Sequence, residues 1–97
     1  MLTIYYRSSI LVHMKSENEL NELIEVFLSK NTKETMLDFL YGILTPKELM
    51  EISRRLQIVK MLKKGIAQHE IANSLQVGVA TVTRGSKELQ KGRFKNI

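Results

Sequence analysis

The chain has 97 residues, of which fifteen are Lys or Arg and ten are Asp or Glu, and its net charge is +5 at neutral pH. A chain of this length forms one small domain with a limited interior. It contains no cysteine, so we expect no disulfide, no thiolate chemistry and no zinc site, which fits the cytoplasm. No apolar run reaches the length needed to cross a membrane.

The charge is unevenly divided along the chain. Residues 1–44 carry four basic and six acidic side chains, whereas residues 45–97 carry eleven basic and four acidic side chains. The second part therefore has a surplus of positive charge. This surplus predicts contacts with phosphate groups and an affinity for DNA that falls as salt rises.

The first segment is the least informative. We expect residues 1–13 to be either an arm that packs on a partner or an extension outside the fold, and residues 14–97 to form the helical domain. Ser16 followed by Glu19 has the pattern of a capping box, so the first clear helix is predicted to begin there. An apolar stripe along residues 20–28 supports that helix.

Two more helices are predicted from residues 32 to 64. Thr32 can cap the second helix. Residues 45–48, Thr-Pro-Lys-Glu, have the features that open a third: a Thr cap, a Pro at the first helical position and an acid three residues after the cap. Gly65 is the natural end of that third helix. Together these patterns predict an all-α fold.

One charged residue is out of place on the third helix. Arg55 falls inside the helix's apolar stripe, which consists of Ile52, Leu56, Val59 and Leu62. A guanidinium among apolar neighbours needs an anion or a flat surface on which to stack. Spacing alone leaves two interpretations open. Arg55 either helps to line a small-molecule pocket, or it extends outward and pairs with Glu51 one turn earlier.

The segment of residues 66–90 has the pattern of a helix-turn-helix that reads DNA. Apolar residues give each of its two short helices one buried edge, and these residues are Ile71, Ala72 and Leu75 in the first helix, and Val82 and Leu89 in the second. A pair of this kind lays its second helix into the major groove. An ordinary helical hairpin is the alternative, but the basic charge of residues 45–97 favours DNA.

The surface of the second helix suits contact with base edges. Val79 and Ala80 lie opposite the core-facing arc, where apolar groups can meet thymine methyls, although mild surface hydrophobicity has the same pattern. One flank, which carries Thr81, Arg84 and Glu88, is free for another partner. Gln68 and His69 are expected near phosphates. The predicted DNA-contacting residues are Gln68, His69, Gly78, Val79, Ala80, Thr81, Thr83 and Lys87.

Several short segments together resemble the tryptophan (trp) repressor family. They are Leu44-Thr45-Pro46, Arg55-x-x-Ile58-Val59, Gly65 and residues 80–86, Ala-Thr-Val-Thr-Arg-Gly-Ser. The resemblance covers residues 15–91 and is most specific over residues 78–86. It implies an intertwined homodimer with about five helices per chain, which binds palindromic operator DNA when L-tryptophan, the corepressor, occupies a pocket between the helix-turn-helix and the partner's core.

The resemblance also implies which residues bind the ligand. Arg55 and Arg84 would stack on the two faces of the indole, and Arg84 and the Thr45 hydroxyl would hold the carboxylate. The ligand would fix the angle of the reading helices and so favour the form that binds DNA. Val59 would be part of the pocket wall, and Gly85 would leave room for the ring. Main-chain carbonyls near Gly42 and Leu44 would face the ligand's ammonium.

The sequence departs from the family pattern in several places. The turn before Gln68 is one residue short and lacks a Ser/Thr cap, so the first reading helix is expected to start differently. Gln76 stands where Gly is usual, at a cost of about 1 kcal/mol if that site is left-handed. Glu88 replaces a small hydroxyl residue. It either pairs with the ligand's ammonium and selects amino acids over deaminated indole acids, or it pairs with Arg84 or Lys91 and competes with the ligand.

A different class of protein remains an alternative. Helix-turn-helix modules with a similar Thr-x-Thr-Arg segment also occur in replication initiators and in small proteins that accompany transposases, and these need no small ligand. The ligand-type residues Thr45, Arg55 and Arg84 count against it. An enzyme is not expected, because the sequence has only two histidines, His13 and His69, and neither paired carboxylates nor a phosphate-binding loop. No metal site or catalytic residue is predicted.

Overall fold

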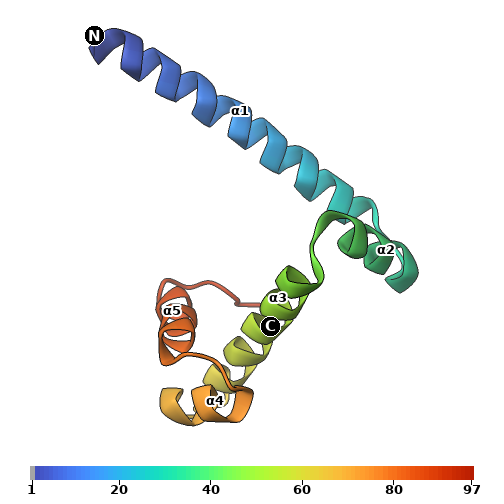
Figure 1. Ribbon diagram of the computed structural model, residues 1–97, viewed down its shortest axis with the longest axis vertical. Coiled ribbons are helices and arrows are strands. Elements are labelled where there is room, and N and C mark those ends of the chain that lie inside the picture. The colour runs from blue at the N-terminus through green and yellow to red at the C-terminus, as the bar shows by residue number, and fades with distance from the viewer. Residues whose placement is uncertain (1) are drawn as a thin grey trace. The chain divides into compact units, whose positions relative to one another are not determined.

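The computed structural model describes the backbone of residues 2–97 and the side-chain surroundings of residues 15–97. Residues 2–97 form five helices and no strand (Figure 1), which confirms the all-α prediction. The helices are α1 (Leu2–Ser29), α2 (Lys33–Ile43), α3 (Pro46–Lys63), α4 (Gln68–Leu75) and α5 (Val79–Gln90). The chain divides into two compact units, which we call the N-terminal unit (Met1–Gly42) and the C-terminal unit (Ile43–Ile97).

The first helix starts earlier than predicted. α1 runs through Ser16 without a break, so the expected helix start with a capping box of Ser16 and Glu19 was wrong. A capping box serves the unpaired N–H groups of a helix's first turn, and inside a continuous helix those groups already have carbonyl partners. The arm or extension expected at residues 1–13 lies outside the residues whose side chains the structure describes.

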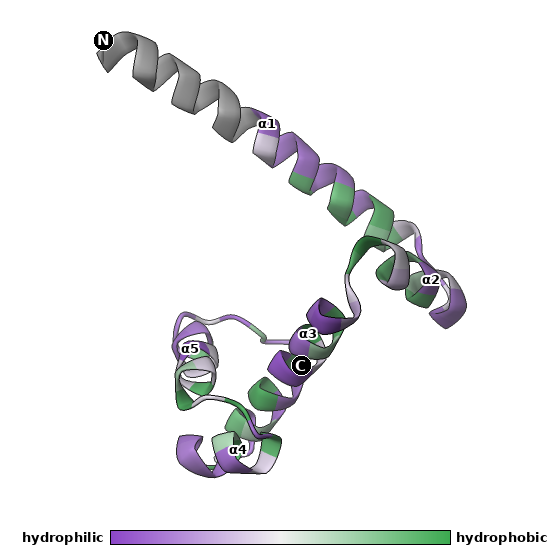
Figure 2. Ribbon diagram, in the orientation of Figure 1, coloured by the Kyte–Doolittle hydropathy of each residue, from purple (hydrophilic) through white to green (hydrophobic). Residues whose placement is uncertain are grey.

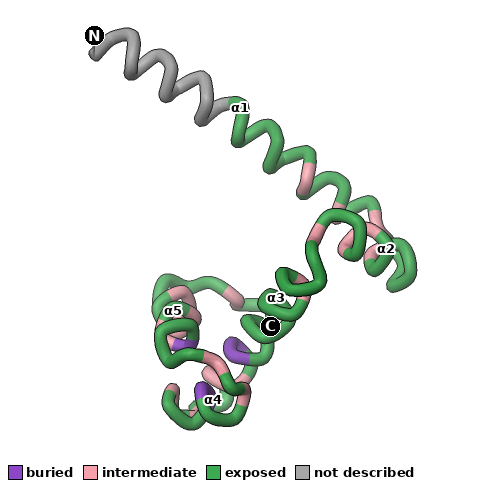
Figure 3. Tube along the Cα trace, viewed as in Figure 1, coloured by how far each residue is buried: buried purple, intermediate pink, exposed green. Residues whose placement is uncertain are grey.

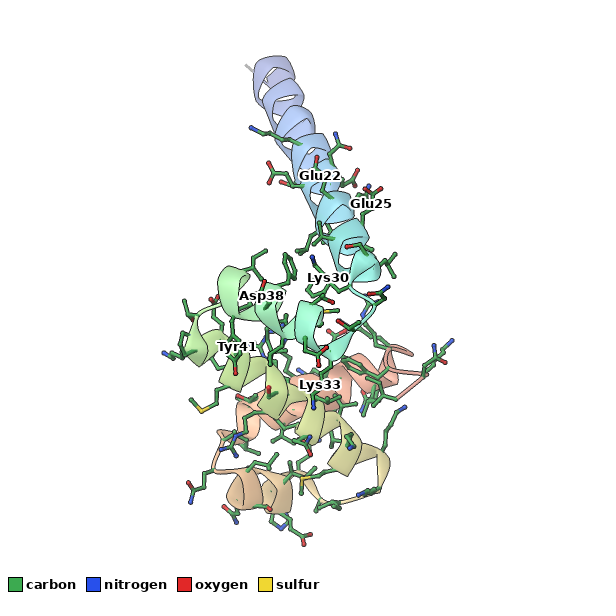
Figure 4. All side chains as sticks on the ribbon, turned by 90° about the vertical axis from the view of Figure 1, so that its right-hand side faces the viewer. Glu22, Glu25, Lys30, Lys33, Asp38 and Tyr41 are labelled. Atoms are coloured by element: carbon green, nitrogen blue, oxygen red, sulfur yellow. The ribbon has the colours of Figure 1, made fainter. Side chains whose placement is uncertain are left out.

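Aromatic side chains join the two helices of the N-terminal unit. The rings of Phe27 and Phe39 meet edge to face, with centroids 5.3 Å apart and planes at 87°, which is a favoured aromatic geometry. The ammonium of Lys30, labelled in Figure 4, lies 5.6 Å from the centroid of the Phe39 ring. Thr32 caps α2 as predicted, because its hydroxyl oxygen accepts a hydrogen bond of 3.1 Å from the Thr35 N–H.

Apolar side chains of the N-terminal unit remain exposed in the single chain. Leu20, Ile24 and Leu28 of α1 are 55%, 45% and 79% exposed. Apolar segments, green in Figure 2, recur along the described part of α1, whereas the buried segments of Figure 3 lie on α3, α4 and α5. Contiguous exposed apolar surface is typical of a site that meets a partner.

The core of the C-terminal unit takes one large side chain from each of its three helices. Ile58 of α3, Ile71 of α4 and Val82 of α5 are at most 1% exposed and lie in one cluster. Ile71 and Val82 lie on the edges that the sequence predicts. Of the predicted stripe on α3, Val59 is buried, whereas Ile52 and Leu56 stay 48% and 43% exposed in the single chain. The reason is that α4 and α5 pack on the face of α3 that carries Ile58.

α3 begins and ends as predicted. The Thr45 hydroxyl oxygen accepts from the Glu48 N–H at 3.1 Å, and Glu48 Oε1 accepts from the Thr45 N–H at 2.9 Å. These two bonds form a capping box with Pro46 at the start of the helix. Hydrogen bonds from Thr45, the backbone one first, hold the pKa of Glu48 below its ordinary value. After the helix, Gly65 adopts a φ of +80°, which favours glycine.

Gln76 ends α4 in the left-handed conformation, with φ 55° and ψ 48°. Because a side chain at such a position costs more than glycine does, we expect Gln76→Gly to raise the free energy of unfolding by about 1 kcal/mol. Urea denaturation measures this change. The matched control is Gln90→Gly at the right-handed end of α5, which should lower the same quantity. Equal losses in both variants would show that the Gln76 backbone carries no such cost.

Candidate nucleic-acid interface and adjoining pocket

α4 and α5 lie where the helix-turn-helix was predicted, and they pack against each other and against α3. The chain passes from α4 to α5 through a turn in which the Val77 N–H donates to the Ala72 carbonyl at 3.0 Å. Ala67 and Gly78 precede the two helices, and neither supplies a side-chain cap. As expected from its short turn, α4 therefore starts without a Ser/Thr cap. Helix N-termini without such a cap suit contact with phosphate oxygens.

The start of α5 presents small apolar groups to the surface. Val79 is 54% exposed, and Ala80 and Lys87 are also exposed. His69 on α4 is exposed as well, whereas Thr83 is half-buried. Small apolar groups at the start of a helix suit the edges of bases, and exposed lysine and histidine side chains suit a phosphate backbone.

Thr83 is half-buried where it joins α4 to α5. Its hydroxyl donates to Gln68 Oε1 at 2.7 Å and also lies 3.0 Å from the Val79 carbonyl. This bond links the first turn of α4 to α5. A change at Gln68 or Thr83 therefore removes a bond between α4 and α5 as well as changing the surface.

The flank of α5 that carries Thr81, Arg84 and Glu88 forms one wall of a pocket within the C-terminal unit, and α3 forms another wall. The pocket has a volume of about 230 Å³. Thr81, Arg84 and Glu88, the flank that the sequence left free for a partner, all contribute. The complete lining consists of Arg55, Ile58, Val59, Thr81, Arg84, Gly85, Glu88 and Phe94. Five of the eight residues expected to bind a ligand therefore lie together here, namely Arg55, Val59, Arg84, Gly85 and Glu88.

The guanidinium groups of the two arginines in this pocket have no partner among the described residues. Both side chains are exposed, and within residues 15–97 neither guanidinium forms a hydrogen bond or an ion pair. The pairing of Arg55 with Glu51 that the sequence left open is thus not formed. Two guanidinium groups from different helices, on one pocket with apolar walls, can stack on a flat ring or bind a carboxylate.

Gly85 has a structural reason to be glycine. A Cβ atom at this position would lie 3.2 Å from Ile58 Cγ2 and 3.5 Å from Leu62 Cδ1. The missing side chain therefore allows α5 to approach α3 closely. Since Gly85 also lines the pocket, the same close approach sets the distance between the two pocket walls. Its expected role beside a ligand ring remains a prediction.

Glu88 lines the pocket and pairs with two cations outside it. Oε1 accepts from Lys91 Nζ at 3.3 Å, and Oε2 accepts from Arg93 Nε at 3.1 Å. The hydrogen bond from Lys91, followed by that from Arg93, lowers the pKa of Glu88, so the carboxylate stays charged at neutral pH. The pairing with Lys91 was one of two expectations, whereas the partner Arg93 was not foreseen.

Three residues expected to bind the ligand lie elsewhere. Leu44 and Thr45 stand before the first turn of α3, and neither lines the pocket. Thr45 precedes Arg55 by ten positions on the same helix, which corresponds to about 15 Å along the axis. Of these two residues, only Arg55 lines this pocket. Gly42 belongs to the N-terminal unit, and its contribution stays a prediction.

Sequence reasoning missed contacts that join distant parts of the chain. Phe94 lines the pocket although it follows the last helix, and no periodicity marks it. Arg54, assigned no role from the sequence, donates from Nη1 to the Leu75 carbonyl at 2.8 Å. That bond satisfies an unpaired carbonyl at the end of α4. The Arg54 bond depends on the packing of α4 on α3, and the place of Phe94 depends on the return of the segment after α5 to α3.

Two further findings concern what the described residues lack. In this part of the chain, no helix is both long enough and apolar enough to cross a membrane. Nor do three or more histidine, aspartate or glutamate side chains of the described residues gather in a way that could hold a metal ion.

Comparisons with known proteins agree on one family. A family model described as "Trp repressor protein" matches residues 18–95. A Trp operon repressor homolog of Vibrio campbellii is 36% identical over 77 residues, covering 78% of this chain and 74% of that protein. Homologs of the same name from Actinobacillus succinogenes and Vibrio cholerae are 38% identical over 71 residues (72% and 70%) and 32% identical over 81 residues (82% and 79%). The region matched by the family model contains α2 to α5 and the whole pocket lining.

Proposed function

The chain belongs to the Trp repressor protein family, and we propose that it is a trp operon repressor: a regulatory protein, not an enzyme, that binds palindromic operator DNA with L-tryptophan as corepressor. This proposal rests mainly on one observation. The guanidinium groups of Arg55 and Arg84 line one pocket beside α5, the proposed reading helix, and neither has a partner among residues 15–97. The proposed regulated genes are those of tryptophan biosynthesis or uptake.

The chemistry of the pocket suits an aromatic amino acid. Arg55 on α3 and Arg84 on α5 supply two planar cations, which stack on an aromatic ring more readily than lysine does. Arg84 can also hold a carboxylate through two parallel hydrogen bonds. The apolar walls of Ile58 and Val59 suit the edge of an indole. At about 230 Å³ the pocket is smaller than the usual ~300–1,000 Å³ of sites for larger ligands.

The ligand site is proposed to be shared between two copies of the chain. Thr45 does not line the pocket of its own chain and stands about 15 Å from Arg55 along α3, so its proposed contact with tryptophan is assigned to the partner's Thr45. The exposed apolar residues Leu20 and Ile24 on α1 supply a surface for that partner. A two-fold homodimer also places two reading helices about 34 Å apart, one turn of DNA.

Ligand binding acts on the angle of α5. The ring would be wedged between Arg55 on α3 and Arg84 on α5, so it contacts the reading helix directly. A ligand shifts an equilibrium only by its difference in affinity for two states. L-tryptophan is proposed to favour the state in which both copies of α5 fit successive major grooves.

Selection from a random DNA pool tests this function. Bound DNA is recovered and sequenced after rounds with and without L-tryptophan, at one salt concentration. We expect a palindrome with half-sites one helical turn apart, enriched only with L-tryptophan. The basic balance of residues 45–97 also predicts that affinity falls steeply with salt. Recovery of unrelated sequences under both conditions would reject sequence-specific recognition.

Substitutions at Ala80 and Lys87 on α5 should distinguish contact with bases from contact with phosphates. We expect Ala80→Leu to change the preferred operator sequence, with effects of about 1–3 kcal/mol at individual base pairs. Lys87→Ala should weaken all sequences alike and flatten the salt dependence. Lys87 is a better test than Lys91, whose ammonium is paired with Glu88. Binding measured against a panel of operator variants distinguishes the two, and a uniform loss in Ala80→Leu would show that Ala80 does not face the bases.

A further inference from the structure

The residues after α5 return to α3 and are fastened there. Gly92, with a φ of +91°, turns the chain at the end of α5, and the segment then runs back toward α3 (Figure 1). The Lys63 ammonium donates to the main-chain oxygens of Phe94 and Ile97. Within this C-terminal segment, defined as residues 92–97, the Ile97 N–H donates to the Phe94 carbonyl at 3.4 Å.

Phe94 is placed by this segment against the pocket. Its side chain is half-buried and lines the pocket together with Arg55 and Arg84. The backbone of Phe94 has a φ of 64°, which is rare for a bulky residue and costs free energy. The turn thus places an aromatic ring on the pocket at a cost in backbone free energy.

Glu88 ties the same segment to α5. Its carboxylate pairs with Lys91 and with Arg93, while its carbonyl accepts from the Arg93 N–H at 3.2 Å. The Glu88 side chain is 28% exposed, against 65% for Lys91 and 68% for Arg93. The carboxylate therefore stands at the pocket rim and holds the chain just before Phe94.

We propose that residues 92–97 form a lid over the ligand pocket, with Phe94 as an aromatic wall that contacts the ligand and Glu88 as the residue that holds the lid closed. This inference rests on the proposed function and adds to it a third contact with the ligand ring and a route for ligand exchange. The ring of the ligand would meet Phe94 in addition to the two guanidinium groups. Release of the ligand would require the lid to open, so the ion pairs of Glu88 would set its rate.

Calorimetry and stopped-flow fluorescence with L-tryptophan test whether the Phe94 ring contacts the ligand. The chain has no tryptophan of its own, so the ligand's fluorescence reports binding directly. We expect Phe94→Ala and Phe94→Asn each to weaken binding about tenfold. Asparagine tolerates the left-handed backbone better than phenylalanine, so Phe94→Asn removes the ring without disturbing the turn. The control is Asn96→Ala, an exposed position of the same segment, which should leave affinity unchanged.

Hydrogen exchange without ligand tests whether Glu88 holds the lid. We expect Glu88→Gln, which keeps the shape and removes the charge, to speed exchange of the Arg93 and Ile97 amides several-fold. Glu70→Gln, an exposed position on α4, should leave these amides unchanged. With L-tryptophan bound, Glu88→Gln should also release the ligand several-fold faster, because the lid would open more often.

The outcomes separate this inference from the function on which it rests. If the wild type binds L-tryptophan and the Phe94 variants bind equally well, the lid inference is overturned and the proposed function stands. If the wild type does not bind L-tryptophan, the corepressor proposal and the Phe94 wall fall together, and exchange in Glu88→Gln decides whether Glu88 holds the segment. Unchanged exchange in Glu88→Gln overturns that role of Glu88.

Discussion

Arg84→Ala is expected to weaken L-tryptophan binding about 100-fold and to abolish the response of DNA binding to tryptophan. The substitution removes both a stacking cation and a bidentate partner for the carboxylate, which together account for about 2.7 kcal/mol. Arg55→Ala removes only stacking, so its loss should be about tenfold. Arg84→Lys should recover little, because an ammonium offers a point charge in place of a planar fork. Titration calorimetry measures all three affinities.

Arg54→Ala is the matched control for these arginine variants. Arg54 neighbours Arg55, carries the same charge and lines no part of the proposed ligand pocket. Its hydrogen bond to the Leu75 carbonyl predicts a loss of stability with unchanged tryptophan affinity. If Arg54→Ala weakened tryptophan binding as much as Arg84→Ala, the loss would reflect positive charge in general, and the assigned stacking site would be wrong.

The double substitution Leu20→Glu/Ile24→Glu should convert a dimer into monomers. In the proposed homodimer these side chains are covered by the partner, and each fully buried leucine or isoleucine contributes about 1.5–3 kcal/mol. Charged replacements also have to lose their hydration. We expect dissociation at micromolar concentration, measured by sedimentation velocity, and loss of operator binding, because one copy presents only one reading helix.

A substitution on the polar side of the same helix controls for charge alone. By helical spacing, Asn18 lies on the side of α1 that also carries Glu22 and Glu25, roughly opposite Leu20. Asn18→Glu adds an acid to α1 and should leave the dimer intact. A wild-type protein that sediments as a folded monomer at micromolar concentration would contradict the dimer and, with it, the shared ligand site.

Local signals explain which parts of the fold were predictable. The start of α3 depends on Thr45, Pro46 and Glu48, which lie within four residues of one another. Their hydrogen-bonding pattern can therefore be predicted without the rest of the chain. The left-handed backbone at Gln76 is the conformation considered there because the family pattern usually has glycine at this position. The buried edges of α4 and α5 were predictable because each helix has one narrow apolar side, which Ile71 and Val82 occupy.

Contacts between distant segments explain what was missed. The apolar stripe of α3 was ambiguous because that helix has apolar residues on more than one side, and only the packing of α4 and α5 selects Ile58. At Ser16 a local capping pattern was overridden by helix propagation from earlier residues. Phe94 and Arg93 follow the last helix, where no period exists, and their roles depend on Glu88 and Lys63.

Arg55 shows where spacing alone reaches its limit. Its position in an apolar stripe was equally compatible with a pocket and with a pairing to Glu51. The structure leaves this guanidinium without a partner among residues 15–97 and places it on the same pocket as Arg84. The proximity of these two cations, 29 positions apart in the sequence, is a tertiary property, and the proposed function depends on it.

Fluorescence anisotropy of labelled operator DNA, titrated with the protein at fixed salt with and without L-tryptophan, tests the central claim most directly. We predict that tryptophan increases operator affinity within the range of about 5–150-fold typical of coupled sites, and that Arg84→Ala shows no such increase. Equal operator affinity with and without tryptophan in the wild type would contradict a corepressor and would instead fit a ligand-independent helix-turn-helix module.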